Sequence, residues 1–233
     1  MIDARLNKLY PDLRAVVKRL YAAAPDIPAE RHALLRPLAD YVRHHAPARL
    51  NFICTHNSRR SHLAMVWAAV SAYLHGHDHV TTLSGGTEAT ALHPNMVGAL
   101  RRAGFKIEVE EKTKAEKETE ANHPGQQVQV PPLGGLGGTL KGGPRYLIHF
   151  AEGVTPLRCF SKVYDHPSNA AGPFAAVMVC DSANEACPVI PGAAARLPLT
   201  YADPKVGDGT AREEAIYDER VGEIGRDLLW GLG

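Results

Sequence analysis

The sequence lacks any long apolar run. Although 45% of its 233 residues are hydrophobic, no segment reaches the ~18 consecutive apolar residues that a membrane-spanning helix needs. The first residues, MIDARLNKLYPDLR, also lack the apolar region of a secretory signal peptide. We therefore expect a cytoplasmic protein that does not associate with a membrane.

An excess of charge of either sign is also missing. The 26 lysine and arginine residues nearly balance the 25 aspartate and glutamate residues, which gives a formal net charge of +1. Binding to nucleic acid or to an anionic membrane surface depends on concentrated positive charge. The composition therefore predicts no nucleic-acid partner.

Cysteine is scarce, and the whole chain has four: Cys54, Cys159, Cys180 and Cys187. They are too few to hold a chain of this length together by disulfide bonds, which are in any case rare in the reducing cytoplasm. Catalysis or redox chemistry explains them better than a structural framework does. Cys159 is an exception, because it lies inside an expected strand where ordinary packing accounts for it.

A chain of this length can bury one sizeable core, and we expect one main domain over 49–233. Residues 1–48 carry apolar stripes at helical spacing, which predicts a helical extension packed on that domain. Residues 112–143 are crowded with glycine and proline, which predicts a flexible surface insertion. Alternating runs at 105–111 and 145–164 predict inserted strands, the second of them a β-hairpin.

The stretch with the clearest chemistry is 50–67, LNFICTHNSRRSHLAMVW. An apolar run ends in Cys54 and the spacing becomes helical after Arg60, which predicts a strand, a tight loop and a helix. A loop at a helix N-terminus presents free backbone N–H groups and the positive end of the helix dipole, so it favours anions. The same dipole and the Arg60 guanidinium favour a thiolate at Cys54. The planar guanidinium can also hold two oxygens of a phosphate or arsenate.

A second apolar run, 174–179, ends in Cys180, and Cys187 follows seven residues later. Because the carboxyl ends of parallel strands gather at one edge of a sheet, Cys54 and Cys180 are expected to converge. Seven helical residues rise about 10.5 Å, whereas a disulfide needs Cα atoms closer than about 7 Å. If the segment is helical, Cys180 and Cys187 can pair only when it unwinds. The alternative is a pair of reduced structural thiols.

The Cys-x5-Arg-Ser loop, with a strand before it and a helix after it, resembles the phosphate-binding loop of the low-molecular-weight tyrosine phosphatases and of the thioredoxin-coupled arsenate reductases built on the same fold. The resemblance implies a three-layer α/β domain with a mainly parallel sheet. It also implies that Cys54 is the nucleophile, that Arg60 binds the oxyanion and that Ser61 hydrogen-bonds the thiolate. Asn57 would hold the loop in shape. The oxyanion-binding loop would consist of Thr55, His56, Asn57, Ser58, Arg59 and Arg60, with His56 where the best-known members carry glycine.

The segment from Cys180 to Cys187 is similar to the redox segment of those arsenate reductases, which the plain phosphatases of this fold lack. The similarity implies a relay in which Cys54 attacks arsenate and Cys180 attacks the Cys54 adduct, releasing arsenite. Cys187 would then attack the Cys54–Cys180 disulfide, and thioredoxin would reduce the resulting Cys180–Cys187 bond by thiol–disulfide exchange. Met65 stands where some of these reductases carry a glutamate that helps to bind potassium, so the sequence does not predict potassium dependence.

Expelling an alkoxide or a hydroxide from phosphorus or arsenic requires a proton donor. Asp203, in an Asp-Pro pair shortly before a predicted C-terminal helix, resembles the acid of the family and is assigned that role. Asp208 is its competitor. No cofactor and no metal site is predicted.

Three functions are compatible with these residues. The first hypothesis is a thioredoxin-coupled arsenate reductase. The second is a phosphatase that hydrolyses phosphotyrosine or small phosphomonoesters through a phosphocysteine at Cys54, in which case Cys180 and Cys187 only protect the nucleophile from oxidation. The third is a sensor whose loop binds an oxyanion without turnover.

Overall fold

The computed structural model of the protein describes residues 2–110, 143–169, 172–187 and 189–233. Within these ranges, no helix is both long enough and apolar enough to cross a bilayer. The predicted flexible insertion at 112–143 lies, apart from Gly143, outside the described residues.

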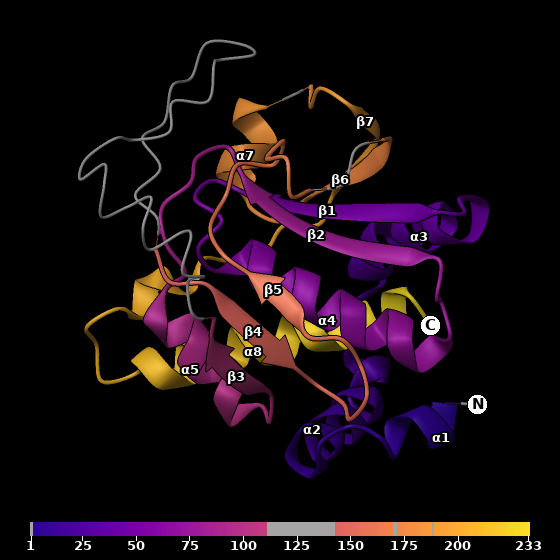
Figure 1. Ribbon diagram of the computed structural model, residues 1–233, viewed down its shortest axis with the longest axis vertical. Coiled ribbons are helices and arrows are strands. Elements are labelled where there is room, and N and C mark those ends of the chain that lie inside the picture. The colour runs from indigo at the N-terminus through magenta and orange to yellow at the C-terminus, as the bar shows by residue number, and fades with distance from the viewer. Residues whose placement is uncertain (1, 111–142, 170–171, 188) are drawn as a thin grey trace.

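A parallel four-stranded sheet, in the order β2-β1-β6-β7, forms the centre of an α/β fold (Figure 1). The strands are β1 (Ala48–Cys54), β2 (Val80–Gly86), β6 (Phe174–Met178) and β7 (Ala193–Pro198). β1 pairs with β2 along its whole length and with β6 on its other side. Because β1 is central and covered on both faces, its residues are almost all buried.

The strands that lead to the two site cysteines are confirmed, but the sequence pattern does not predict β7. Its sequence, AAARLP, contains no β-branched residue and no alternation of apolar and polar side chains. The segment is a strand because it pairs in parallel with β6. Tertiary pairing therefore overrides a weak local preference at this edge.

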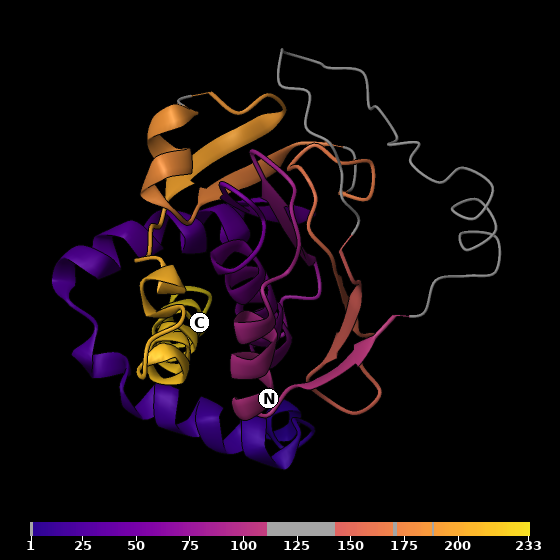
Figure 2. The same cartoon turned by 90° about the vertical axis from the view of Figure 1, so that its left-hand side faces the viewer.

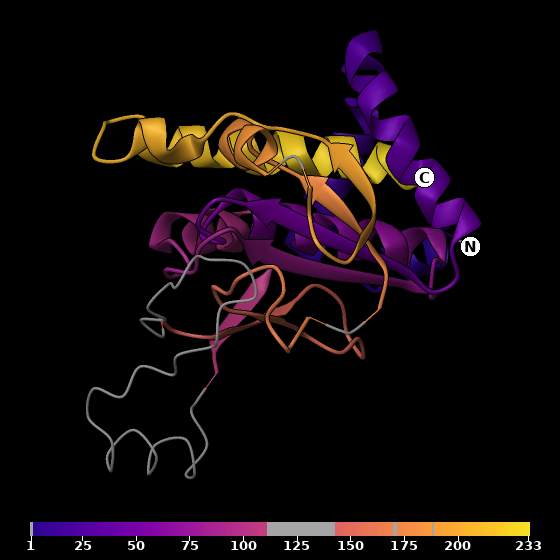
Figure 3. The same cartoon turned by 90° about the horizontal axis from the view of Figure 1, so that it is seen from above.

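Helices flank the sheet. α4 (Arg60–His75) packs on β1 and β2, and α8 (Glu213–Gly231) packs against α4, while the short α7 (Asp181–Ala186) contacts β1 and β6. Figure 2 shows α4 and α5 (Pro94–Arg102) between α8, in yellow, and the separate antiparallel sheet of residues 106–109, 146–149 and 157–159. The same arrangement is seen from above in Figure 3.

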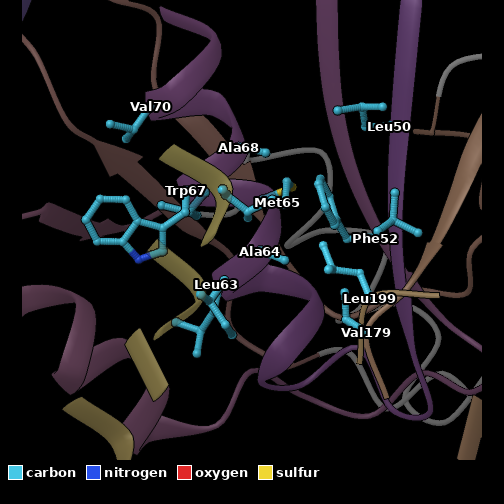
Figure 4. Close-up of a cluster of buried hydrophobic side chains, with 14 of the residues drawn as sticks. Leu50, Phe52, Leu63, Ala64, Met65, Trp67, Ala68, Val70, Val179 and Leu199 are labelled. Carbon is cyan, nitrogen blue, oxygen red and sulfur yellow. The ribbon is translucent and has the colours of Figure 1, made fainter. Parts of the chain in front are cut away.

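α4 is buried nearly all round because it contacts the sheet on one side and helices on the other. Figure 4 shows its small residues Ala64 and Ala68 on the side of Phe52 of β1. The bulky Leu63 and Trp67 lie on the opposite side of the helix. The predicted helix is thus confirmed, and its first turn is fixed against the end of β1.

The expected helical extension at the N-terminus is observed as α1 (Ile2–Leu6), α2 (Pro11–Ala22), the 3-10 turn η1 (Ala24–Asp26) and α3 (Ala29–His44). Both α2 and α3 pack against α8. A buried ion pair joins α3 to α8, with Arg31 Nε donating to Asp227 Oδ2 at 2.6 Å. The extension is therefore part of the same core as the sheet and its helices.

The inserted strands do not extend the central sheet. β3 (Lys106–Val109), β4 (Tyr146–His149) and β5 (Leu157–Cys159) form a separate antiparallel sheet in that order. The predicted hairpin within 145–164 is confirmed as the β4–β5 pair. After β5 the chain returns to the central sheet, where Val163 forms a bridge with Gly86 at the end of β2.

Gly225 lies where α8 approaches α4 and α2. A Cβ at this position would lie 2.7 Å from Trp67 and 2.8 Å from Leu20, inside van der Waals contact. We therefore expect Gly225→Ala to lower the free energy of unfolding by about 1–3 kcal/mol through overpacking. At Gly222 of the same helix the nearest atom, on Leu20, would be 3.9 Å away, so Gly222→Ala should raise stability by up to about 1 kcal/mol through helix propensity. Urea unfolding checks both, and two changes of the same sign would contradict the packing described.

Candidate functional site

The loop between Cys54 and Arg60 connects the end of β1 to the start of α4, as predicted. Cys54 is the last residue of β1 and its side chain is nearly buried. Arg60 is the first residue of α4. The nucleophile candidate and the guanidinium therefore lie at the carboxyl edge of the sheet, beside a helix N-terminus.

The chain beyond β2 runs alongside the loop and binds its carbonyl oxygens. The Thr87 N–H donates to the Cys54 oxygen at 3.1 Å, and the Glu88 N–H donates to the Thr55 oxygen at 2.8 Å. Gly86 permits this approach, because a Cβ there would lie 2.7 Å from the Thr55 oxygen. This side of the loop is fixed by backbone contacts that need no particular side chain.

Two more carbonyl oxygens of the loop accept hydrogen bonds from residues outside the loop. The Ser161 and Thr90 hydroxyls donate to the His56 oxygen at 3.0 and 3.3 Å. The His93 N–H donates to the Ser58 oxygen at 3.1 Å. These donors come from segments that are distant in the sequence and meet only at this loop.

Unlike its carbonyl oxygens, the backbone N–H groups of the loop, those of 55–60, have no hydrogen-bond partner among the described residues. Successive unpaired N–H groups at the start of a helix form a concavity that attracts anions. The loop therefore has the backbone arrangement expected of an oxyanion site.

Asn57 holds the loop from inside. Its φ of 46° lies in the left-handed region, which asparagine tolerates better than most residues. Its amide Nδ2 donates to Ser61 Oγ at 2.8 Å, and its Oδ1 accepts from the Lys162 N–H at 2.9 Å. Because the Ser61 oxygen already accepts from Asn57, the Ser61 hydroxyl can donate to Cys54 Sγ, 3.1 Å away. Asn57 and Ser61 thus form a chain of hydrogen bonds that ends at the Cys54 sulfur.

A small pocket opens at the loop. Its lining consists of Cys54, Thr55, His56, Ser58, Arg59, Arg60 and Asp203. Arg60 is the link between the loop and Asp203, since one guanidinium nitrogen donates to Asp203 Oδ2 at 2.6 Å and another to the Tyr201 oxygen at 2.9 Å. The structure thus brings Asp203, the predicted acid, to the pocket mouth.

Asp208, the competing candidate for the acid, forms hydrogen bonds with other residues than Asp203 does. Arg59 donates to its Oδ2 at 2.8 Å, and the Tyr217 hydroxyl donates to its Oδ1 at 2.7 Å. Partial burial acts to raise the pKa of Asp208, but the Tyr217 hydrogen bond and the Arg59 charge together hold that pKa below its ordinary value. Both oxygens of Asp203 also accept hydrogen bonds, from Arg60 and from the Lys205 N–H. What separates the two aspartates is the pocket, which Asp203 lines and Asp208 does not, so Asp208 is the poorer candidate for a proton donor.

Cys180 lies next to the loop, as expected of a residue that follows a strand adjacent to β1. Its Sγ is 3.6 Å from Thr55 Oγ1 and accepts from the Ala183 N–H at 3.4 Å, so it caps the start of α7. Cys187 stands at the other end of α7, is half-buried, and like Cys180 is a free thiol. The segment between the two cysteines is thus the helix α7, as the first of the two sequence alternatives required.

Cys159 is not part of the site. It is fully buried in the second sheet, and burial raises its pKa to about 12. Across the parts of the chain that are described, no group of three His, Cys, Asp or Glu side chains is arranged to hold a metal ion.

The structure adds residues that the sequence pattern does not single out. Lys162 binds Asn57 through its backbone, and His93 binds Ser58. Tyr217, from α8, hydrogen-bonds Arg59. None of them belongs to a motif or a periodic stripe that signals a site, because each reaches the loop only through tertiary folding.

The contacts of Asn57 lead to a stability prediction. Asn57→Ala removes two buried hydrogen bonds, each contributing about 1 kcal/mol, and places a β-carbon in the left-handed region at a cost of roughly 1–2 kcal/mol. Asn57→Gly loses the same hydrogen bonds without the backbone cost. In urea unfolding we expect a loss of about 3 kcal/mol for the alanine variant and a smaller loss for the glycine variant. Equal losses would show that the loop does not hold this residue at positive φ.

Comparison with known proteins gives no assignment: no model of a protein family matches the chain, and no curated protein matches it. The function proposed below is therefore argued from the loop, the cysteines and the geometry of the pocket.

Proposed function

We propose that the protein reduces arsenate to arsenite, with Cys54 as nucleophile, Cys180 and Cys187 as redox pair, and thioredoxin as the electron donor. The observation that carries the proposal is the position of Cys180, whose sulfur lies 3.6 Å from Thr55 Oγ1, beside the residue that follows Cys54. A phosphatase needs one thiol at such a loop, whereas an internal reductant needs a second thiol within reach of the first. We also propose the three-layer fold of the low-molecular-weight phosphatases and a cytoplasmic location.

The first step uses the loop alone. The unpaired N–H groups of 55–60 and the Arg60 guanidinium hold a tetrahedral dianion, and the Ser61 hydroxyl supports the Cys54 thiolate. The thiolate attacks arsenic, a sulfur–arsenic bond forms, and one oxygen leaves as water. Asp203, which borders the same pocket, delivers the proton to that oxygen.

The relay then moves two electrons. The Cys180 thiolate attacks the Cys54 sulfur, the sulfur–arsenic bond breaks, and arsenite leaves with the electron pair. The product is a Cys54–Cys180 disulfide. Cys187 attacks the Cys180 sulfur, which releases the Cys54 thiolate and leaves a Cys180–Cys187 disulfide. The dithiol of thioredoxin reduces that bond and becomes a disulfide itself.

α7 permits the last exchange. It has six residues, which is shorter than an isolated helix needs for stability in water. Its own helical stability is therefore low, and it must unwind because a disulfide requires Cα atoms closer than about 7 Å. The more exposed thiol is Cys187, which suits the residue whose disulfide an external protein must reach.

A phosphatase is the second candidate, and the composition of the pocket favours it. Cys54, Arg60 and Asp203 line one small cavity and would suffice for a phosphocysteine intermediate and its hydrolysis. The substrate would be phosphotyrosine or a small phosphomonoester. A sensor that binds an oxyanion without turnover is the third.

Removing the cysteines one at a time separates these functions. With arsenate, thioredoxin, thioredoxin reductase and NADPH, we expect NADPH oxidation to fall to background in Cys54→Ala, Cys180→Ala and Cys187→Ala. Cys159→Ala is the matched control and should retain turnover, because Cys159 lies in the second sheet. Mass spectrometry should find a Cys54–Cys180 disulfide trapped in Cys187→Ala after one turnover.

The other functions give different results in the same set of variants. Hydrolysis of an aryl phosphate that needs Cys54 but survives loss of Cys180 and Cys187, with no reduction of arsenate, would replace the reductase by the phosphatase. Absence of turnover in both assays would leave the sensor.

The two aspartates give a second test. We expect Asp203→Asn to lower the rate of the first chemical step by about 10²–10⁴-fold, the usual contribution of a positioned proton donor. Asp208→Asn should lower it far less, because Asp208 acts on Arg59 and Tyr217 rather than facing the pocket. Single-turnover kinetics at saturating arsenate makes the comparison, and the reverse order of effects would transfer the role of acid to Asp208.

A further inference from the structure

Lys162 is buried, with 4% of its surface exposed. A lysine ammonium is costly to remove from water unless a negative charge accompanies it. Within the described part of the chain, no carboxylate forms an ion pair with Lys162. An unpaired buried cation of this kind requires a physical explanation.

The contacts of Lys162 place it against the anion loop. Its backbone N–H donates to Asn57 Oδ1 at 2.9 Å, and Asn57 is the residue that holds the loop in shape. Its Nζ donates to Ser84 Oγ at 3.4 Å and lies 4.7 Å from the centre of the Phe160 ring. The aromatic face offsets part of the desolvation cost but supplies no negative charge.

Ser84 continues the connection to the loop. It belongs to β2, two residues before Gly86, which the loop approaches, and its Oγ lies 3.3 Å from His62 Nδ1. His62 follows Ser61, the residue beside the Cys54 sulfur. The ammonium is therefore connected through Ser84 and His62 to the helix turn that carries Ser61.

The titratable groups around Lys162 carry no compensating negative charge. Burial and the Lys162 charge lower the pKa of His62 well below its usual value, so the imidazole is neutral. Burial raises the pKa of Cys159 to about 12, so that thiol is protonated. Burial, and then Lys162, also lower the pKa of His166. What remains to balance the ammonium is the anion that the loop itself binds.

We propose that the Lys162 ammonium is the buried counter-charge of the oxyanion bound by the loop, and that it strengthens the binding of dianions there. The inference rests on the proposed anion-binding role of the loop and extends it to a residue outside the loop. Lys162 does not line the pocket, so in this proposal it acts at a distance through its charge. In the low dielectric of the interior such an interaction is screened far less than it would be in water.

The pH dependence follows from the protonation of Lys162. Burial lowers its pKa to about 8, against the small opposing effect of Cys159. The ammonium is charged below that pH and neutral above it. Attraction of the oxyanion is therefore present at pH 7 and lost as the pH rises through about 8.

Sulfate binding to the full chain in a Cys54→Ser background tests the proposal. Sulfate is a tetrahedral dianion whose charge does not change between pH 7 and 9.5, and the serine background removes titration of the nucleophile. Isothermal titration calorimetry at several pH values should give an affinity that falls on the order of tenfold across pH 8, the size expected of one charge interaction inside a protein.

Lys162→Met and a matched control make the comparison specific. We expect Lys162→Met to bind sulfate on the order of tenfold more weakly at pH 7 and with no fall across pH 8. Lys106→Met is the control, because Lys106 also places its Nζ over an aromatic ring, 3.9 Å from the centre of Tyr10, but is exposed on β3. It should bind sulfate as the Cys54→Ser reference does.

Several results would overturn the proposal. They are a flat pH profile in the reference, no sulfate binding in the reference, and a Lys162→Met defect of the same size at pH 7 and 9.5, which would indicate packing rather than charge. If Lys162→Met does not fold, the pH profile of the reference decides alone. Failure of the proposed function is detected by the turnover assays and not by sulfate binding. Sulfate can bind with this pH profile in a protein that turns over neither arsenate nor an aryl phosphate.

Discussion

The hydrogen bonds that hold the Cys54–Arg60 loop from outside are the constraint on which the site depends. A backbone loop has as many N–H donors as carbonyl acceptors, and an anion site forms only when the two point in opposite directions. Here the acceptors of Thr55, His56 and Ser58 are bound by neighbouring segments. Asn57, at positive φ, supports the turn from within. In the described part of the chain, no acceptor binds the N–H groups of 55–60, so these donors remain available to an anion.

A second support comes from the N-terminal extension, which lies outside the minimal fold that the resemblance implies. Arg31 of α3 pairs with Asp227, donates to the Thr200 oxygen at 3.0 Å, and lies 4.2 Å from the centre of the Tyr201 ring. The Tyr201 oxygen in turn accepts from Arg60. Through Arg31, α3 thus helps to place the segment that carries the candidate acid.

Sequence reasoning succeeded where local structure depends on neighbours along the chain. Cys54, Asn57, Arg60 and Ser61 lie within eight residues, so the spacing alone predicts a strand, an anion loop and a helix. The convergence of Cys180 on that loop was also predictable, because adjacent parallel strands end at one edge. The separate second sheet and β7 were not, since strand partners are chosen by packing and by backbone pairing rather than by local preference.

The amino-acid sequence by itself determined the local order of the site: which strand ends in a thiol, which loop precedes a helix, and where the thiol pair Cys180 and Cys187 stands. Tertiary structure alone decided that Lys162, from the chain after β5, and Tyr201, from the chain after β7, reach that loop through their backbone, and that Arg60 pairs with the Asp203 carboxylate. The reason is physical. Local spacing sets backbone geometry over a few residues, whereas burial, ion pairing and the direction of a distant hydrogen bond depend on how separate elements pack.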